Sequence, residues 1–120
     1  PKGYSNAVSA TGRMVFVAGQ IGWDETETFQ SDDFIAQVRQ TLSNTMAALE
    51  AAGAGAQHIV RMTWYVTDKQ EYLSRLDEMG AVYREVIGRH FPAMAMVEVS
   101  ALMEDRAKVE IETTAMIEEG

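Results

Sequence analysis

The chain has 120 residues, of which 47% are hydrophobic, and a formal net charge of −8 at pH 7. A chain of this length and composition is expected to fold as one domain, residues 1–120, around a buried core. Nucleic-acid binding is disfavoured, because ten Lys and Arg residues are scattered among eighteen Asp and Glu residues, whereas neutralising phosphates requires clustered positive charge.

Two short segments at the start of the chain are predicted to form a β-hairpin. Residues 4–9 are short and mixed, residues 11–13 carry a turn signal, and residues 14–18 form an apolar run rich in β-forming residues. Gly19 and Gly22 then flank Gln20 and Ile21, which indicates that the backbone bends there or approaches another group closely.

A first helix is predicted to begin at Ser31 and to end at Gly53. Ser31 is a good capping residue, and the aspartates at 32 and 33 complement the positive end of a helix dipole. Gly53 is a typical helix stop. Between these limits, apolar residues recur at the spacing of an amphipathic helix: Phe34, Val38, Leu42, Met46 and Leu49.

The second half of the chain is predicted to contain a strand, a helix and two further strands. Residues in Ile59–Val66 alternate between apolar and polar, as in a half-buried strand. Asp68 and Glu71 have the spacing of a capping box, which opens a helix that ends at Gly88. Residues 91–99 and 108–113 again alternate with period two, so both are predicted strands.

The last two strands are the stretch that could best form the wall of a pocket. Met94 and Met96 share one face of the first strand, and Glu110 and Glu112 share one face of the second, about 6–7 Å apart by strand rise. From the residues alone, the plainer interpretation of the glutamates is a solvated or subunit-contact row, since unpaired glutamates are mostly exposed. The full predicted order is β–β–α–β–α–β–β. It favours an α+β fold with a mixed sheet and two helices packed on one face.

Several kinds of chemistry are disfavoured by residues that the chain lacks. Without cysteine there is no disulfide, no thiolate nucleophile and no cysteine metal site. His58 and His90 are far apart and lack the spacing of metal ligands, so no metal site is expected. The longest apolar run has about five residues, far short of the ~20 of a membrane-spanning helix. These features are those of a cytoplasmic protein that does not contact membranes.

Several motifs together resemble the RidA/YjgF family of reactive intermediate deaminases. They are Tyr4-Ser5, VFVAGQI at residues 15–21, FPA at residues 91–93, VEV at residues 97–99 and VEIE at residues 109–112. The resemblance runs in order through nearly the whole chain. It implies a chorismate-mutase-like α+β fold and a homotrimer with an inner β-barrel and ligand clefts between neighbouring subunits. It also implies hydrolysis of imines and enamines derived from amino acids to keto acids and ammonia, without a metal or an organic cofactor.

The resemblance assigns roles to particular residues. Glu110 matches the glutamate that orients the attacking water, which is plausible chemistry for a carboxylate beside an imine carbon. Gly19 matches a glycine whose backbone lies against the ligand, and Tyr4 matches a tyrosine near the cleft mouth. The family's asparagine position falls near Gly80. The alternatives are a subunit salt bridge for Glu110, a β-bulge for Gly19 and a surface aromatic for Tyr4.

One position departs from the family pattern. Deaminating members follow Phe-Pro-Ala with an arginine that clamps the substrate carboxylate, and this chain has Met94 there. Methionine offers no charge-assisted hydrogen bond, and a buried carboxylate without its partner costs on the order of 2–5 kcal/mol. Met96 is apolar too, so the cleft is predicted to be more apolar than that of an imino-acid deaminase. Arg13, Arg61 and Arg89 are the candidates for a replacement cation. Arg61 is the best placed, although an outward surface charge is its plainer interpretation.

Two functional hypotheses follow. The first is a cofactor-free hydrolase that uses Glu110 on an imine or enamine metabolite other than the standard 2-imino acids. The alternative is a non-catalytic trimer whose clefts, lined by Met94 and Met96, bind a small ligand. An endoribonuclease activity, a label that some family members carry, conflicts with the acidic charge and ranks last. The expected partners are further copies of the chain and a small-molecule metabolite.

Overall fold

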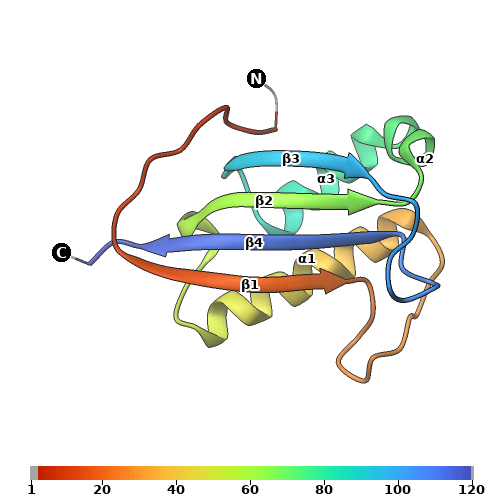
Figure 1. The fold of residues 1–120 in the computed structure, drawn as a ribbon, viewed down its shortest axis with the longest axis horizontal. Coiled ribbons are helices and arrows are strands. Elements are labelled where there is room, and N and C mark those ends of the chain that lie inside the picture. Colours follow the sequence, from red (N-terminus) through yellow and green to blue (C-terminus); the bar gives the residue numbers. More distant parts are fainter. Residues whose placement is uncertain (1–2, 120) are drawn as a thin grey trace.

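A four-stranded mixed sheet with helices on one face forms the fold in the computed structural model, which describes residues 3–119 (Figure 1). The strands lie in the order β1-β4-β2-β3. β4 is antiparallel to both β1 and β2, and β3 is parallel to β2, so β1 and β3 are the two edges of the sheet. The strands are β1 (Arg13–Ile21), β2 (Ile59–Val66), β3 (Ala93–Glu98) and β4 (Val109–Ile117).

The helices lie behind the sheet in the view of Figure 1. They are α1 (Phe34–Ala51), the short 3-10 helix η1 (Ala56–His58), α2 (Lys69–Ser74) and α3 (Leu76–Val86). Helix α1 packs against β1, β4 and α3. Its N-cap is Asp33 and not the predicted Ser31, because the Asp33 carboxylate accepts the Ala36 N–H at 3.0 Å. The Ser31 hydroxyl instead accepts the N–H of Asp33, just before the helix begins.

The predicted N-terminal hairpin is wrong. Within residues 4–9, the one β contact is an isolated parallel bridge between Ser5 and Ala93, at the opposite edge of the sheet. β1 pairs instead with β4, a nine-residue strand that buries alternate side chains. A short, mixed segment cannot bury as much apolar surface as β4 does. The element order is therefore β–α–β–α–α–β–β, with four strands instead of five.

The predicted second helix is interrupted at Arg75, which leaves helical geometry with φ −127° and ψ 29°. Its start is confirmed, since the Asp68 carboxylate accepts the N–H groups of Gln70 and Glu71. The Arg75 guanidinium donates to Asp33 at 2.5 Å and to Glu78 at 2.8 Å. The break therefore orients Arg75 to join the N-terminus of α1 to the first turn of α3.

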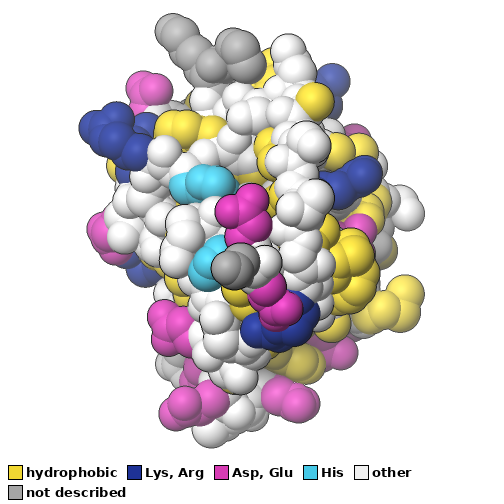
Figure 2. Space-filling view, turned by 90° about the vertical axis from the view of Figure 1, so that its left-hand side faces the viewer, with side chains coloured by type: hydrophobic (Ala, Val, Ile, Leu, Met, Phe, Trp, Pro, Cys, Tyr) yellow, Lys and Arg dark blue, Asp and Glu magenta, His cyan; other side chains and the backbone are white. Residues whose placement is uncertain are grey.

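The core lies between the sheet and the helices. Its largest fully buried side chains include Trp64, Phe34, Leu42, Leu49, Ile59, Met62 and Ile111. Strand alternation directs the other set of side chains to the open face of the sheet. On that face Phe16 is 72% exposed, Met14 49% and Val97 41%. Figure 2 shows hydrophobic side chains along its right-hand side, where this open face is seen edge-on. Within residues 3–119, no helix is long and apolar enough to cross a membrane.

Candidate functional site

A pocket of about 570 Å³ lies between α3, the β3 edge and the N-terminal segment. It contains three of the five residues predicted for the site, namely Tyr4, Met94 and Met96. Most of its lining is apolar or aromatic. The lining residues are Gly3, Tyr4, Trp64, Tyr72, Leu76, Asp77, Met79, Gly80, Tyr83, Arg84, Phe91, Met94 and Met96.

The two methionines reach this pocket because of the strand register. Met94 pairs with Met62 and Met96 with Trp64, and both partners are buried on the helix side of β2. Residues paired across a sheet point to the same face, so Met94 and Met96 also point to the helix side. As β3 is an edge strand, their side chains are half-exposed beside the pocket instead of being closed into the core.

An aromatic stack forms the pocket floor. The rings of Tyr83 and Phe91 stack with centroids 5.8 Å apart, and Trp64 lies 6.5 Å from Tyr83. The Tyr83 hydroxyl donates to the carbonyl of His90 at 2.6 Å. Burial raises the pKa of Tyr83 well above its ordinary value, and burial also raises the pKa of Tyr72. Both shifts follow from the apolar packing around the two phenols.

Tyr4 reaches the pocket because Ser5 fixes the N-terminal segment beside β3. The Ser5 N–H donates to the carbonyl of Pro92 at 2.9 Å, and its hydroxyl donates to the carbonyl of Phe91 at 2.6 Å. Tyr4 is 43% exposed and lines the pocket from the segment side. This placement agrees with the predicted position near a cleft mouth.

Gly80 and Arg84 lie one turn apart on the pocket side of α3. A Cβ at Gly80 would lie 3.2 Å from a terminal nitrogen of Arg84, so the guanidinium lies over the glycine. Gly80 occupies the position near which the sequence comparison aligned an asparagine of the RidA/YjgF family. Arg84 was not predicted as a site residue. It follows Gly80 by four positions, the spacing that puts two residues on the same face of a helix, and this spacing could have indicated it.

The other two predicted residues lie together elsewhere. Glu110 points away from the core, since Val109 and Ile111 on either side of it are fully buried. A Cβ at Gly19 would lie 2.3 Å from the Glu110 Oε2 atom, so a glycine is required for this approach. The β1–β4 register shifts between Val17 and Gln20, which confirms the predicted irregularity at Gly19.

The structure therefore divides the predicted site in two. Gly19 lies on the edge strand β1 and Glu110 on its neighbour β4, and Glu110 points to the open face. Met94, Met96 and Tyr4 lie at the β3 edge on the helix side. Strand β2 separates Glu110 from β3, and the two halves face opposite sides of the sheet, so one chain does not bring them together.

None of the three arginines suggested by the sequence lines the pocket. Arg13 pairs with Glu119 at 3.1 Å near the end of the sheet. Arg61 lies on the open face, in a separate depression with Phe16 and Glu112, so its plainer interpretation as an outward charge is correct. Arg89 is exposed in the loop after α3.

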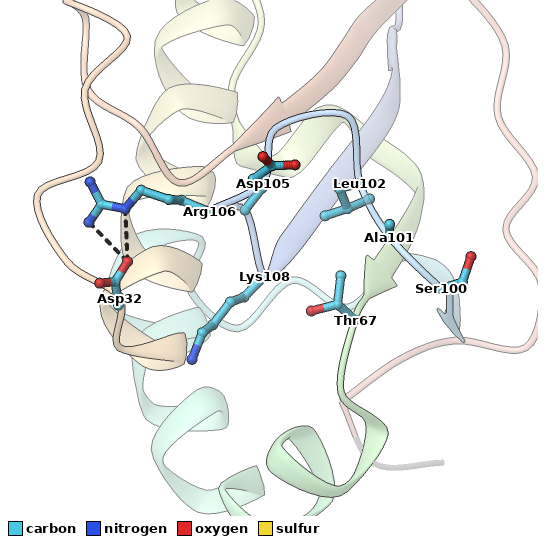
Figure 3. A pocket seen from close by; sticks show the side chains of 9 residues that line it. Asp32, Thr67, Ser100, Ala101, Leu102, Asp105, Arg106 and Lys108 are labelled. Carbon is cyan, nitrogen blue, oxygen red and sulfur yellow. Dashed lines mark hydrogen bonds and ion pairs between the residues drawn. The ribbon is translucent and has the colours of Figure 1, made fainter.

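A depression of about 420 Å³ beside residues 100–108 is less suited to a ligand (Figure 3). Its two cations already have acidic partners: Arg106 pairs with Asp32 at 2.9 Å, and Lys108 pairs with Glu71 at 3.4 Å. Arg106 also lies over the Phe29 ring. The charge available to a ligand is therefore small, and the pocket at the β3 edge is the better candidate.

The histidines gather on one end of the molecule (Figure 2), and each has a backbone partner. His58 accepts the Gly55 N–H at 2.9 Å, and a His90 ring nitrogen lies 2.6 Å from the Ile59 carbonyl. Among residues 3–119, no group of three or more His, Asp or Glu side chains could hold a metal ion.

A mixed sheet covered by helices on one face, with a pocket at its parallel edge, defines an α+β fold. The chain belongs to the Rid (RidA/YjgF) family, because the family model described as endoribonuclease L-PSP matches residues 1–117.

Individual relatives agree with this assignment. A RutC family protein of Pyrococcus horikoshii is 39% identical over 93% of this chain and 85% of its own length. The 2-iminobutanoate/2-iminopropanoate deaminase of Salmonella typhimurium is 37% identical over 88% of this chain and 80% of its own. The solved structure of the Rid family protein YyfB from Yersinia pestis superposes with a TM-score of 0.86. It is 30% identical and covers 96% of this chain and 87% of its own.

Proposed function

We propose that this protein is a cytoplasmic, cofactor-free hydrolase that converts an imine or enamine metabolite to the carbonyl compound and ammonia. The observation that carries the proposal is the pair Glu110 and Gly19. A carboxylate is held so close to the β1 backbone that only a glycine fits beside it. Glu110 accepts no hydrogen bond from any residue in 3–119, so its oxygens are available to a water molecule or a substrate.

The chemistry requires little more than a positioned base. Water adds its oxygen to the electrophilic imine carbon, and Glu110 accepts the proton that the water loses. The nitrogen takes up protons and leaves as ammonia when the carbon–oxygen double bond forms. β1 is an edge strand, so the Gly19 backbone has one side that no strand of the same chain covers. An approaching ligand can therefore contact that backbone without meeting a side chain.

We propose further that the working unit is a homotrimer with its clefts between subunits. The two halves of the site lie on opposite faces of one sheet, on β1 and β4 for Gly19 and Glu110 and at the β3 edge for the pocket. In such a trimer, Glu110 of one chain would lie near the pocket of the next. The exposed Phe16 and Met14 on the open face support such an assembly, since large apolar side chains at 72% and 49% exposure favour a partner surface.

The substrate class follows from the relatives and from the pocket. The name of the Salmonella relative specifies two short 2-imino acids. In this chain Met94 and Met96 line the pocket with Tyr72 and Leu76, which favours an imine with a larger apolar group than those two. RNA is a poor substrate for a chain of net charge −8, despite the description of the family model.

The test compares Glu110→Gln with the matched variant Glu112→Gln. Glu112 lies on the same strand and face, but its carboxylate accepts the Tyr65 hydroxyl at 2.9 Å. Imines are generated in place by an amino-acid oxidase from a panel of amino acids, and the disappearance of imine is timed by semicarbazide trapping. We expect Glu110→Gln to lower the rate about 10²–10⁴-fold, the usual contribution of a general base, and Glu112→Gln to stay near wild type.

Equal rates in wild type and Glu110→Gln would refute the hydrolytic proposal. If every imine decays at the buffer rate while a ligand still binds, the non-catalytic trimer is the correct function. The assembly is tested separately by light scattering of wild type and Phe16→Glu. We expect a trimer mass for wild type and a smaller species for the variant, and a monomeric wild type would refute the shared clefts.

A further inference from the structure

The pocket at the β3 edge holds an arginine without an acidic partner. Within residues 3–119, Arg13, Arg39, Arg75, Arg106 and Lys108 each form an ion pair. In the same part of the chain, Arg61, Lys69, Arg84 and Arg89 form none, and of these four only Arg84 lines the pocket. The Arg84 charge is therefore available to a ligand.

Gly80 permits the position of this guanidinium. The 3.2 Å between a terminal nitrogen of Arg84 and a Cβ built at Gly80 is tighter than an ordinary contact. A Cβ at position 80 would require the guanidinium to shift by a few tenths of an ångström. Gly80 lies half-buried inside α3, where glycine is unfavourable relative to alanine. Helix stability therefore does not explain the glycine at position 80, whereas the space that it leaves for Arg84 does.

A second hydrogen-bond donor belongs to the same wall. Tyr4 adds a phenol at the segment side and is 43% exposed. The Trp64 indole N–H has no partner within the described chain, but it is buried and does not reach the pocket surface. Arg84 and Tyr4 are thus donors on a mostly apolar surface, so the complementary ligand carries acceptors, best as an anion.

Asp77 limits the charge of that anion. It lines the pocket seven residues before Arg84 on α3, about 10 Å away along the helix axis. A second negative group on the ligand would be repelled by the Asp77 carboxylate. The pocket therefore suits one carboxylate near Arg84, with the apolar remainder of the ligand against Met94 and Met96.

We propose that Arg84 binds the substrate carboxylate and that the pocket selects monocarboxylic 2-imino acids with a branched or aromatic side chain. The inference deepens the proposed function and rests on it for the imine group. It assigns this role to an arginine other than the three that the sequence suggested, Arg13, Arg61 and Arg89. Met94 then contributes apolar contact to the substrate's side chain.

The test measures binding without turnover, using 4-methyl-2-oxopentanoate, a stable 2-oxo acid, and its uncharged amide. Calorimetry is performed on wild type, Arg84→Gln, Arg84→Lys and Arg89→Gln. Arg89→Gln is the matched control, because it removes the same charge from an exposed loop outside the pocket. We expect Arg84→Gln to raise the Kd of the oxo acid about 10- to 100-fold, as expected for loss of a charge-assisted pair.

The remaining variants and ligands distinguish carboxylate binding by Arg84 from a structural role of this residue. Arg84 lies in the last turn of α3, where a cation also stabilises the helix dipole. Arg84→Lys preserves that effect but not the bidentate geometry, so its Kd should fall between those of wild type and Arg84→Gln. Arg89→Gln should bind as wild type does. The amide should bind weakly to every form, and 2-oxoglutarate, with its second carboxylate, should bind wild type more weakly than the monocarboxylate.

Three results would overturn the inference: no binding of the oxo acid to wild type, equal binding of acid and amide, or an unchanged Kd in Arg84→Gln. Glu110→Gln distinguishes this failure from that of the proposed function. Arg84-dependent binding without hydrolysis of any imine would refute the hydrolase and leave the carboxylate site intact. Hydrolysis that requires Glu110 but not Arg84 would refute the carboxylate site and leave the hydrolase intact.

Discussion

Replacing Gly19 with alanine changes the place where Glu110 can put its carboxylate. The new Cβ would lie 2.3 Å from Oε2, 2.9 Å from Cδ and 3.1 Å from Cγ of Glu110. Ordinary van der Waals contact begins at 3.4 Å, so the oxygen must move by about 1.1 Å. The atoms that must move belong to the end of a flexible side chain, which can rotate toward the open face.

The expected consequences for activity and stability differ. A shift of about 1 Å in a catalytic group can cost about 10²-fold in rate, or about 2.7 kcal/mol in the activation barrier. The free energy of unfolding should change by less than about 1 kcal/mol. Alanine restricts the unfolded chain more than glycine, and the displaced carboxylate remains near solvent. Gly19→Ala is therefore expected to be folded and nearly inactive.

Gly22→Ala provides the contrasting control. A Cβ at Gly22 would lie 2.7 Å from the Cβ and 2.9 Å from the Cα of Gln37 on α1. These atoms cannot rotate away. Gln37 is also buried, with hydrogen bonds to Ser31 and Arg106. Gly22→Ala is thus expected to lose about 1–3 kcal/mol of stability from overpacking.

The assay combines urea unfolding with the imine-trapping rate. The decisive comparison is Gly19→Ala in the Glu110→Gln background. If alanine acts through the carboxylate, the double variant should be no slower than Glu110→Gln alone. Additive losses, or a Gly19→Ala enzyme with the wild-type rate, would refute the reasoning that Gly19 exists to accommodate Glu110.

Three further predictions concern the scaffold. Leu42→Ala should lower the free energy of unfolding by about 2–5 kcal/mol in urea titrations, because Leu42 is fully buried on α1 and leaves a cavity; a loss below 1 kcal/mol would contradict this packing. Ser5→Ala should cost about 0.5–1.5 kcal/mol and weaken oxo-acid binding in calorimetry, since it removes one of the two hydrogen bonds that fix the segment carrying Tyr4; unchanged affinity would show that this bond does not support the pocket. Hydrogen bonds from Thr26 and other loop donors lower the pKa of Asp24 from 3.8 to about 2. A lowered pKa stabilises the fold above pH 3.8, and that stability is lost as pH falls toward 2. Asp24→Ala should therefore show a smaller fall in Tm across this window, and an identical fall would refute the assignment.

The parts of the fold that depend on periodicity were predictable from the sequence. The burial of Val109 and Ile111 beside an outward Glu110 follows from period-two alternation, and the structure confirms it. The pairing of β1 with β4 was not predictable in this way. Alternation shows which side of a strand is buried, but the identity of its neighbour depends on contacts between residues nearly a hundred positions apart.

The candidate site shows the same division. Motif similarity selected Tyr4, Met94 and Met96, which the structure places in one pocket, and it selected Gly19 and Glu110, which the structure places side by side. Arg84 was missed because its relevance depends on the side that α3 presents to β3. The sequence also predicted one continuous helix from Asp68, whereas the structure has a break at Arg75.

The location of the two half-sites on opposite faces of the sheet makes catalysis, in the proposed trimer, a property of pairs of chains. In a trimer assembled from Glu110→Gln and Arg84→Gln chains, some clefts would combine both substituted residues. Others would combine the intact Glu110 of one chain with the intact Arg84 of its neighbour. Two inactive proteins, unfolded and refolded together, would then recover part of the wild-type rate. For the gene, this means that two defective alleles at these positions could complement each other in one cell.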